Sequence, residues 1–205
     1  MKMMAKVIYF DGLSGAGKTT QINWLLQFLE SENKTYRLVR EKEFQPFAKQ
    51  LMQWKNSSEN SLRAFDSVRQ LARARGEMHA KHLIPLLARC DFVIFDRCVY
   101  TSAIYHSYYD HQLQDILKVN YENGIIRPTI GILFLCSVDT ALNRIRLRNR
   151  PIVSLPLSFT EITSFLNFSH RQYSELLKYD SSICRIDTEF SKHQIFNTIK
   201  PLLDL

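Results

Sequence analysis

The sequence predicts an α/β fold with a mostly parallel sheet that is covered by helices on both faces. Five short apolar segments alternate with helical patterns along the 205 residues, which is typical of βαβ units. The segments FVIF and ILFL are apolar at every position, as expected of central parallel strands that are buried on both sides. A glycine-rich loop joins the first strand-like segment to the first helical one, so a phosphate ligand is expected at that junction.

Each expected strand is a short β-rich run. In chain order these runs are KVIYF (6–10), TYRLVRE (35–41), DFVIFD (91–96), TIGILFLC (129–136) and SICRIDT (182–188). Ligands of such sheets bind beyond the carboxyl ends of the strands. We therefore expect residues 11, 40, 96 and 136 to surround one cleft.

Helical periodicity fills the intervals between the strands. QINWLLQFLE follows the glycine-rich loop as an amphipathic run, and Phe65, Val68, Leu71 and Ala72 repeat with a helical period as core residues. The segment RPIVSLPLS (150–158) has two prolines and little charge, so it is expected to be a loop between two helices. The helices are expected at 18–32, 44–54, 61–89 with a break near Gly76, 101–120, 138–149, 159–178 and 191–203.

The composition is that of one globular domain, 1–205, with a basic balance. Hydrophobic residues make up 45% and charged residues 23% of the chain, and the formal net charge is +7. We expect no membrane span and no signal peptide, and four widely spaced cysteines favour a reducing cytoplasm. The chain has no long basic tract and no nucleic-acid motif, which argues against nucleic-acid binding. An enzyme that handles polyphosphates also needs arginine and lysine.

The stretch YFDGLSGAGKTTQ (9–21) fits the phosphate-loop pattern. Its glycines permit backbone angles that turn several N–H groups inward, and the following helix adds its first free N–H groups. Lys18 is expected to reach the β and γ phosphates, and the Thr19 hydroxyl is expected to ligate Mg²⁺. The alternative is an ordinary glycine-rich turn, and the flanking strand and helix speak against it. The expected ATP-binding residues are Gly12, Ser14, Gly15, Ala16, Gly17, Lys18, Thr19 and Thr20.

Charged residues end two further strands. Asp96 ends DFVIFD, where a carboxylate commonly faces the Mg²⁺ of a phosphate-loop enzyme, and Arg97 follows as a candidate ligand of the acceptor phosphate. Arg40 lies at the end of TYRLVRE, where a second ligand is expected, and its guanidinium suits a phosphate. The alternative for all three residues is a solvated charge at a strand end.

Arginine recurs at every second position of NRIRLRNRP, as Arg144, Arg146, Arg148 and Arg150. On a helix, residues four apart share one side, where like charges repel and gain from anionic partners. Beside the proline-containing loop, this pattern predicts a lid at about 148–160 that brings Arg148 or Arg150 over the transferring phosphoryl group. A solvated basic helix face is the alternative.

These motifs lie in segments that resemble, in the same order, segments of the thymidylate kinases. The segments are FDGLSGAGKTTQINWLLQFLE, VREKEF, ARGEMHAKHLIPLLARCDFVIFDRCVYTSAIYHS, RPTIGILFLCSVDTALNRIRLR and SFLNFSHRQYSELL, and they span nearly the whole chain. The resemblance implies a P-loop three-layer α/β/α fold with a five-stranded parallel sheet and a helical lid. It also implies phosphoryl transfer from ATP to dTMP with Mg²⁺, in a cytoplasmic homodimer.

The resemblance also assigns roles by position. Arg40 falls on the arginine that contacts the acceptor phosphate, Arg75 on the arginine that hydrogen-bonds the thymine base, and Leu71 on the aromatic residue that stacks on it. Ala16 stands where one branch of the family has an arginine, which would leave catalysis to the lid arginines. The implied metal ligands are Thr19 and Asp96, the catalytic residues are Lys18, Arg97, Arg148 and Arg150, and the acceptor-binding residues are Asp11, Arg40, Leu71, Arg75, Arg97 and Tyr105.

The chain departs from the family pattern around the acceptor. Ser14 replaces an acid that contacts the acceptor sugar, Leu71 replaces the stacking aromatic, Glu77 replaces a glutamine near the base, and Cys98 replaces the aromatic after the DR pair. REKEF also stands in place of REPGG. A site built to bond one base loses strongly when its polar partners change. Two alternatives therefore stay open, namely a kinase of another small acceptor (a nucleoside or a non-nucleotide) and a catalytically lapsed nucleotide-binding protein.

Overall fold

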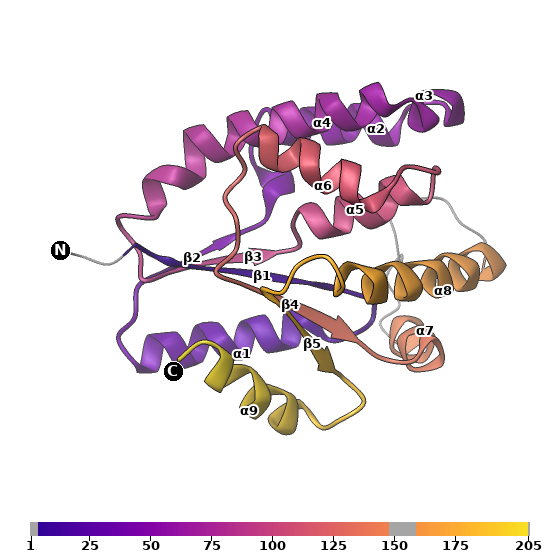
Figure 1. Ribbon diagram of the computed structural model, residues 1–205. Helices are drawn as coiled ribbons and strands as arrows, with labels where there is room; N and C mark the ends of the chain where they lie inside the picture. Colours follow the sequence, from indigo (N-terminus) through magenta and orange to yellow (C-terminus); the bar gives the residue numbers. More distant parts are fainter. Residues whose placement is uncertain (1–3, 148–158, 205) are drawn as a thin grey trace.

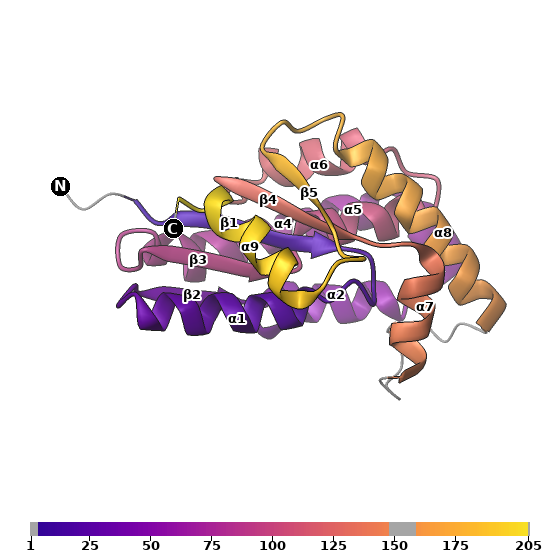
Figure 2. The ribbon, with the colours of Figure 1, turned by 90° about the horizontal axis from the view of Figure 1, so that it is seen from below.

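The computed structural model describes residues 4–147 and 159–204, and its sheet confirms the predicted α/β fold class (Figure 1). The strands are β1 (Lys6–Gly12), β2 (Tyr36–Val39), β3 (Phe92–Asp96), β4 (Ile130–Leu135) and β5 (Ile183–Asp187). They form a five-stranded sheet in the order β2-β3-β1-β4-β5, and every neighbouring pair is parallel. Because all strands run the same way, their carboxyl ends share one edge of the sheet (Figure 2).

Helices cover both faces of this sheet. In Figure 1, α2 to α6 lie on one face, α1 and α9 lie on the other, and α7 and α8 lie toward the carboxyl ends of the strands. The α-helices are α1 (Lys18–Ser31), α2 (Phe47–Lys55), α3 (Glu59–Arg63), α4 (Phe65–Met78), α5 (Val99–Ser107), α6 (Leu113–Glu122), α7 (Val138–Leu147), α8 (Phe159–Leu176) and α9 (Lys192–Leu202). Within the described ranges, no helix is long and apolar enough to cross a membrane.

The central strands are apolar because both of their faces are covered. Ile8 of β1 pairs with Ile94 of β3 and Ile130 of β4, and the side chains of Ile8 and Ile94 are completely buried. Phe10 and Phe134 stack between β1 and β4 with their ring centroids 5.4 Å apart. Burial on both sides rewards apolar residues at every position, and it produces the continuous runs that predicted these strands.

The segment predicted as one helix over 61–89 is divided twice, and the second division lies two residues after Gly76, close to the predicted break. Helix α4 runs through Gly76 and ends at Met78, where a π-helical turn (His79–Leu83) and a 3-10 turn (Ile84–Leu86) follow. A Cβ at Gly76 would lie 2.0 Å from the carbonyl oxygen of Asn123, just after α6. This glycine therefore permits a close approach of two segments rather than a helix break. The earlier break falls at Ala64, which has an extended backbone.

The helix predicted over 101–120 is also two helices. Helix α5 ends at Ser107 and α6 begins at Leu113, with Asp110 between them in a left-handed conformation (φ 68°). Aspartate tolerates this conformation better than most residues, so the turn carries no glycine or proline signal. The helix predicted from residue 44 begins only at Phe47, after a 3-10 turn at Glu41–Glu43. The predicted loop 150–158 and residues 148 and 149 of the predicted helix 138–149 lie outside the described residues.

Candidate functional site

The phosphate loop joins the end of β1 to α1. Gly12 has a φ of 123°, and a Cβ there would lie 2.2 Å from the carbonyl oxygen of Phe134 on β4, so only glycine fits. The Leu13 amide donates to the same carbonyl at 3.0 Å, which holds the loop against the neighbouring strand. Gly17 is the N-cap of α1 in a left-handed conformation, and Lys18 is the first helical residue. The first N–H groups of an α-helix lack the usual partner four residues earlier, so this helix start can stabilise an anion.

The Lys18 side chain folds back over the loop. Its Nζ donates to the carbonyl oxygens of Gly12 and Leu13, both at 2.8 Å, and the residue is 6% exposed. Burial lowers the pKa of Lys18 well below its ordinary value, and the nearby Arg97 guanidinium lowers it further. The ammonium group is thus held by neutral carbonyls in a place where an anionic ligand would stabilise its charge.

Asp11 lies beneath the phosphate loop and is completely buried. Its Oδ1 accepts from the Gly12 amide at 2.8 Å, the Thr101 hydroxyl at 2.6 Å and the Tyr173 hydroxyl at 2.9 Å. Its Oδ2 accepts from the Thr101 amide at 2.8 Å and the Cys98 amide at 3.3 Å. The carboxylate therefore links β1, α5 and α8. Contact of Asp11 with an acceptor stays a prediction, and its observed partners are all protein groups.

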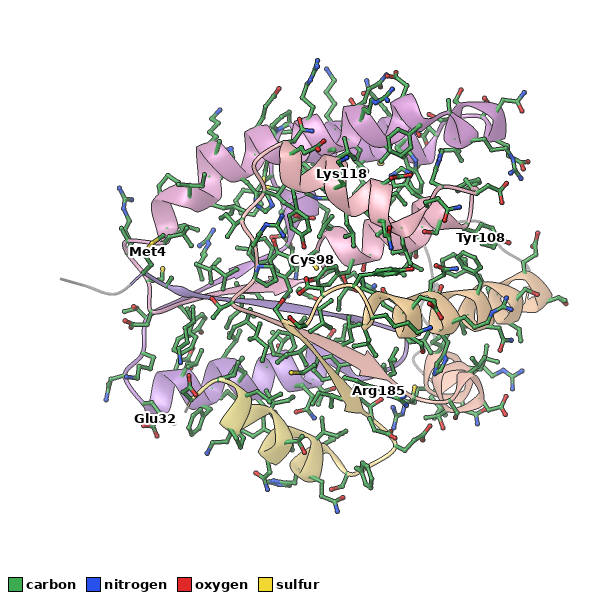
Figure 3. The ribbon with its side chains drawn as sticks, in the orientation of Figure 1. Met4, Glu32, Cys98, Tyr108, Lys118 and Arg185 are labelled. Carbon is green, nitrogen blue, oxygen red and sulfur yellow. The ribbon has the colours of Figure 1, made fainter. Side chains whose placement is uncertain are left out.

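Arg97 follows β3 with a left-handed backbone (φ 70°), which is uncommon for a residue with a side chain. Its guanidinium donates to the hydroxyls of Thr101 at 3.1 Å and Ser14 at 3.3 Å, and lies 4.0 Å from Asp11. The adjacent Cys98 lies at the turn between β3 and α5 (Figure 3). Burial, together with the neighbouring Asp11, raises the pKa of the Cys98 thiol well above its ordinary value, so the thiol stays protonated.

Arg40 and Asp96 meet where the neighbouring strands β2 and β3 end. Arg40 Nε lies 3.1 Å from Asp96 Oδ2, with side-chain exposures of 38% and 17%. Arg40 also lies 3.6 Å from Glu43 on the following turn. The pair combines the residue predicted to bind the acceptor phosphate with the residue predicted to face the metal.

Arg40, Asp96 and Arg97 line one cleft of about 410 Å³ between the sheet edge and helices α2, α4 and α5, whereas Lys18 is not in its lining. It contains several of the predicted site residues, namely Ser14, Thr19, Arg40, Leu71, Arg75, Asp96, Arg97 and Tyr105. Of the strand ends expected around one cleft, residues 40 and 96 line it, whereas Asp11 and Cys136 are buried outside its lining. Arg148 and Arg150 lie outside the described residues. A larger hollow of about 540 Å³, between the α5–α6 turn and α8, contains none of the predicted residues.

Arg75 is held by a buried polar network on the inner wall of the cleft. The residue is 1% exposed, and its guanidinium donates to Glu41 at 3.0 Å, Asn120 at 2.6 Å and Ser102 at 2.5 Å. Its Cζ also lies 4.4 Å from the centre of the Phe47 ring. Burial tends to raise the pKa of Glu41, but Arg75 and a hydrogen bond with His79 together hold that pKa below its ordinary value. This network fixes the direction in which Arg75 faces the cleft.

Residues that the sequence analysis did not single out complete the site. Thr101 and Tyr173 bind Asp11 across 90 and 162 positions of sequence, and no local pattern encodes such contacts. Trp54 and His106 line the cleft from α2 and α5. The only available signal for Tyr173 and His106 was their position in segments that carry the family resemblance.

His106 makes stability depend on pH. Burial, with smaller contributions from His111 and Arg75, lowers the pKa of His106 to about 3, so the folded protein keeps this imidazole neutral. The unfolded chain takes up a proton near pH 6.5, and folding then excludes that proton. The free energy of unfolding therefore falls as pH decreases below 6.5, by about 1.4 kcal/mol per unit for this one group.

We expect the wild type to lose about 2 kcal/mol more stability between pH 7 and pH 5 than His106→Gln does. Urea unfolding followed by circular dichroism measures this difference at the two pH values. The matched control is His193→Gln, because His193 is exposed on α9. An equal loss in the wild type and in His106→Gln would show that His106 takes up a proton in the folded state.

Comparison with known proteins places this site in a sequence family. A family model described as thymidylate kinase matches residues 10–199. A thymidylate kinase of Neorickettsia sennetsu is 29% identical over 152 residues, which cover 70% of this chain and 72% of that protein. A thymidylate kinase of Chlorobaculum parvum is 30% identical over 156 residues, covering 75% of this chain and 70% of that protein. One from Nitrosospira multiformis is 33% identical over 103 residues, about half of each chain.

Proposed function

The chain belongs to the thymidylate kinase family, and we propose on this premise that it transfers the γ-phosphoryl group of ATP to dTMP. The bond between the γ phosphorus and the β–γ bridging oxygen breaks, and a bond to a dTMP phosphate oxygen forms, so the products are ADP and dTDP. The observation that carries the proposal is one cleft lined by Thr19, at the start of α1, together with Arg40, Asp96 and Arg97. The relatives described above all bear the name thymidylate kinase.

The donor side is formed by the phosphate loop and the start of α1. The loop amides and the N-terminus of α1 would bind the β and γ phosphates, and Lys18 would turn from its two carbonyl partners toward them. In the transition state, negative charge spreads over the transferring group, and a lysine already desolvated by the loop stabilises that charge strongly.

The oxygen atoms of Thr19 and Asp96 fit a magnesium ion, since both residues line the cleft beside the loop. Among the described residues, no group of three or more His, Cys, Asp or Glu side chains could hold a metal. Magnesium bound with a nucleotide needs only one or two protein ligands, because phosphate oxygens and water complete its octahedron. When bound, Mg²⁺ would neutralise part of the phosphate charge; Thr19 and Asp96 would orient the triphosphate through it.

The acceptor side is formed by three arginines at two depths. Arg40 and Arg97, near the strand ends, would fix the dTMP phosphate in line with the donor, which removes most of the orientational cost of the reaction. Arg75, further in, would bond the base. Asp11 would act beneath them through Thr101, which donates to Asp11 and accepts from Arg97.

The domain organisation, the lid, the location and the oligomeric state follow from the same family membership as proposals. We propose that residues 1–205 form a single kinase domain, and that Arg148 and Arg150 belong to a lid at about 148–160 which closes over the phosphoryl group. We also propose a cytoplasmic location and a homodimer. Light scattering of the purified chain tests the dimer, and a monomeric mass at micromolar concentration would contradict it.

The test of function is ADP release from Mg·ATP in the presence of dTMP, dUMP, dCMP, dGMP or thymidine. Lys18→Ala is the blank in each reaction. We expect dTMP to give the largest stimulation. Stimulation by thymidine alone, or tight ATP binding without transfer to any acceptor, would overturn the proposal and favour one of the two alternatives from the sequence.

A further inference from the structure

The lining of the acceptor cleft is charged at one end and mainly apolar or aromatic at the other. The charged side chains of Arg40, Asp96 and Arg97 in its lining are 17–39% exposed and mark its mouth, whereas several apolar and aromatic lining residues are at most 6% exposed and mark its inner end. Ser102 and His106 lie four residues apart on α5, so they share the side of the helix that faces the cleft. The inner lining residues are Phe47, Leu51, Trp54, Leu71, Tyr105 and His106. A nucleotide that places its phosphate at the mouth therefore places its base at this inner end.

Two ring nitrogens at the inner end are buried without a partner among the described residues. They are Trp54 Nε1 and His106 Nδ1, on side chains that are 6% and 1% exposed. The two rings are in contact, with centroids 4.9 Å apart and planes inclined by 60°. A buried polar atom without a hydrogen bond destabilises a protein, and most such atoms find a partner. Both atoms lie on side chains that line the cleft, so a small rotation of either ring would offer its nitrogen to a polar ligand atom.

Trp54 and Tyr105 offer aromatic surface to a flat base at the inner end. Leu71 lines the cleft but supplies no ring. The Phe47 ring is already covered by the Arg75 guanidinium at 4.4 Å. Trp54 is the largest aromatic side chain in the lining, and Tyr105 and Tyr109 approach it edge-on with centroids 6.4 Å and 6.2 Å away.

We propose that Trp54 and His106 are specificity-determining residues that bind the nucleobase of the acceptor. The indole of Trp54 packs against the base, and its Nε1–H donates to a keto oxygen. The neutral imidazole of His106 carries its proton on Nε2, so its Nδ1 accepts from the ring N–H beside that keto group. Thymine and uracil have such an edge, whereas cytosine lacks the ring N–H. This inference rests on the proposed function, since it identifies how the same cleft selects dTMP.

Tryptophan fluorescence gives a direct test because the chain has two tryptophans. Trp24 is on α1, where it packs against His193 and Phe196 of α9 on the other face of the sheet from α2 (Figure 1). In Trp24→Phe, Trp54 is the only emitter and the cleft is intact. We expect dTMP to change its emission with saturation, and we expect no change in Trp54→Phe, which keeps Trp24. An emission from Trp54 that does not respond to saturating dTMP would overturn the proposal.

Kinetics separate base recognition from packing. Trp54→Phe keeps an aromatic ring but loses the N–H donor, so the KM for dTMP should rise about tenfold, with kcat and the KM for ATP within about twofold of the wild type. His106→Phe removes the acceptor nitrogen and should reduce the preference for dUMP over dCMP by about tenfold. Trp24→Phe is the matched control and should leave all constants unchanged.

The outcomes distinguish this inference from the proposed function. If dTMP is phosphorylated while Trp54→Phe and His106→Phe retain the wild-type KM and base preference, the two residues only pack the core and the inference is wrong. If the wild type does not phosphorylate dTMP, the proposed function itself is wrong.

Discussion

Replacing Lys18 by alanine is expected to lower kcat for phosphoryl transfer by about 10³-fold. The Lys18 ammonium is buried and bonded to the carbonyls of Gly12 and Leu13, so it meets the transferring group without first leaving water. Removal of a preorganised charge from a desolvated site affects the transition state far more than the ground state. The KM for ATP should therefore change much less than kcat.

A coupled ADP assay measures the effect of Lys18→Ala, and thermal unfolding checks that the variant is folded. Lys34→Ala is the matched control, because Lys34 is exposed just after α1. Activity of Lys18→Ala within about tenfold of the wild type would show that this lysine does not stabilise the transferring group.

Replacing Glu41 by glutamine is expected to destabilise the protein by about 3–5 kcal/mol. Glu41 is the carboxylate that balances the buried guanidinium of Arg75, and the two side chains are 6% and 1% exposed. Because His79 Nδ1 accepts from the Ile126 amide at 3.0 Å, its proton lies on Nε2, which donates to Glu41 at 2.9 Å. A glutamine that offers its oxygen to Arg75 would turn its NH₂ group toward this N–H. The substitution thus leaves the buried charge of Arg75 without a counter-charge. It also places two N–H donors, those of the glutamine and of His79, against each other.

Urea unfolding at pH 7 measures this loss, and Glu122→Gln on the exposed surface of α6 is the control. The pKa of Glu41 is lowered in the folded state, so its contribution is complete at pH 7 and is lost as pH falls through that lowered pKa. A loss below about 1 kcal/mol would mean that Arg75 finds other compensation.

The fold could be predicted from the sequence to the extent that its signals were local. The apolar strands, the glycine-rich loop and the charges at strand ends are properties of short segments. These properties were enough to predict the parallel sheet and several residues that line the cleft. The breaks at Ala64 and Asp110 could not be predicted, because neither position carries a glycine or a proline. The structural role of Gly76 could not be predicted for a related reason, since it depends on Asn123, which follows α6 and is distant in sequence.

The candidate site was predictable where one residue performs one task and unpredictable where residues act as a group. Lys18, Arg40 and Asp96 each stand in a motif or at a strand end. The buried partners of Asp11 and Arg75 come from helices distant in sequence, and only tertiary packing brings them together. The unpartnered nitrogens of Trp54 and His106 likewise emerge only from three-dimensional burial.

The ion pair between Arg40 and Asp96 makes the binding of the two substrates cooperative under the proposed function. Each partner would have a second task, Asp96 toward the metal-bound nucleotide and Arg40 toward the acceptor phosphate, and a movement of either side chain toward its substrate would break the contact at 3.1 Å. The substrate that binds first would then bear the cost of breaking the contact, and the second substrate would bind a side chain that is already free, so the gain is equal in either order. An ion pair as exposed as this one contributes at most about 1 kcal/mol, which corresponds to a few-fold increase in affinity. Calorimetric titration of dTMP with and without a non-hydrolysable Mg·ATP analogue would detect this increase, and equal affinities would show that the two sites bind independently.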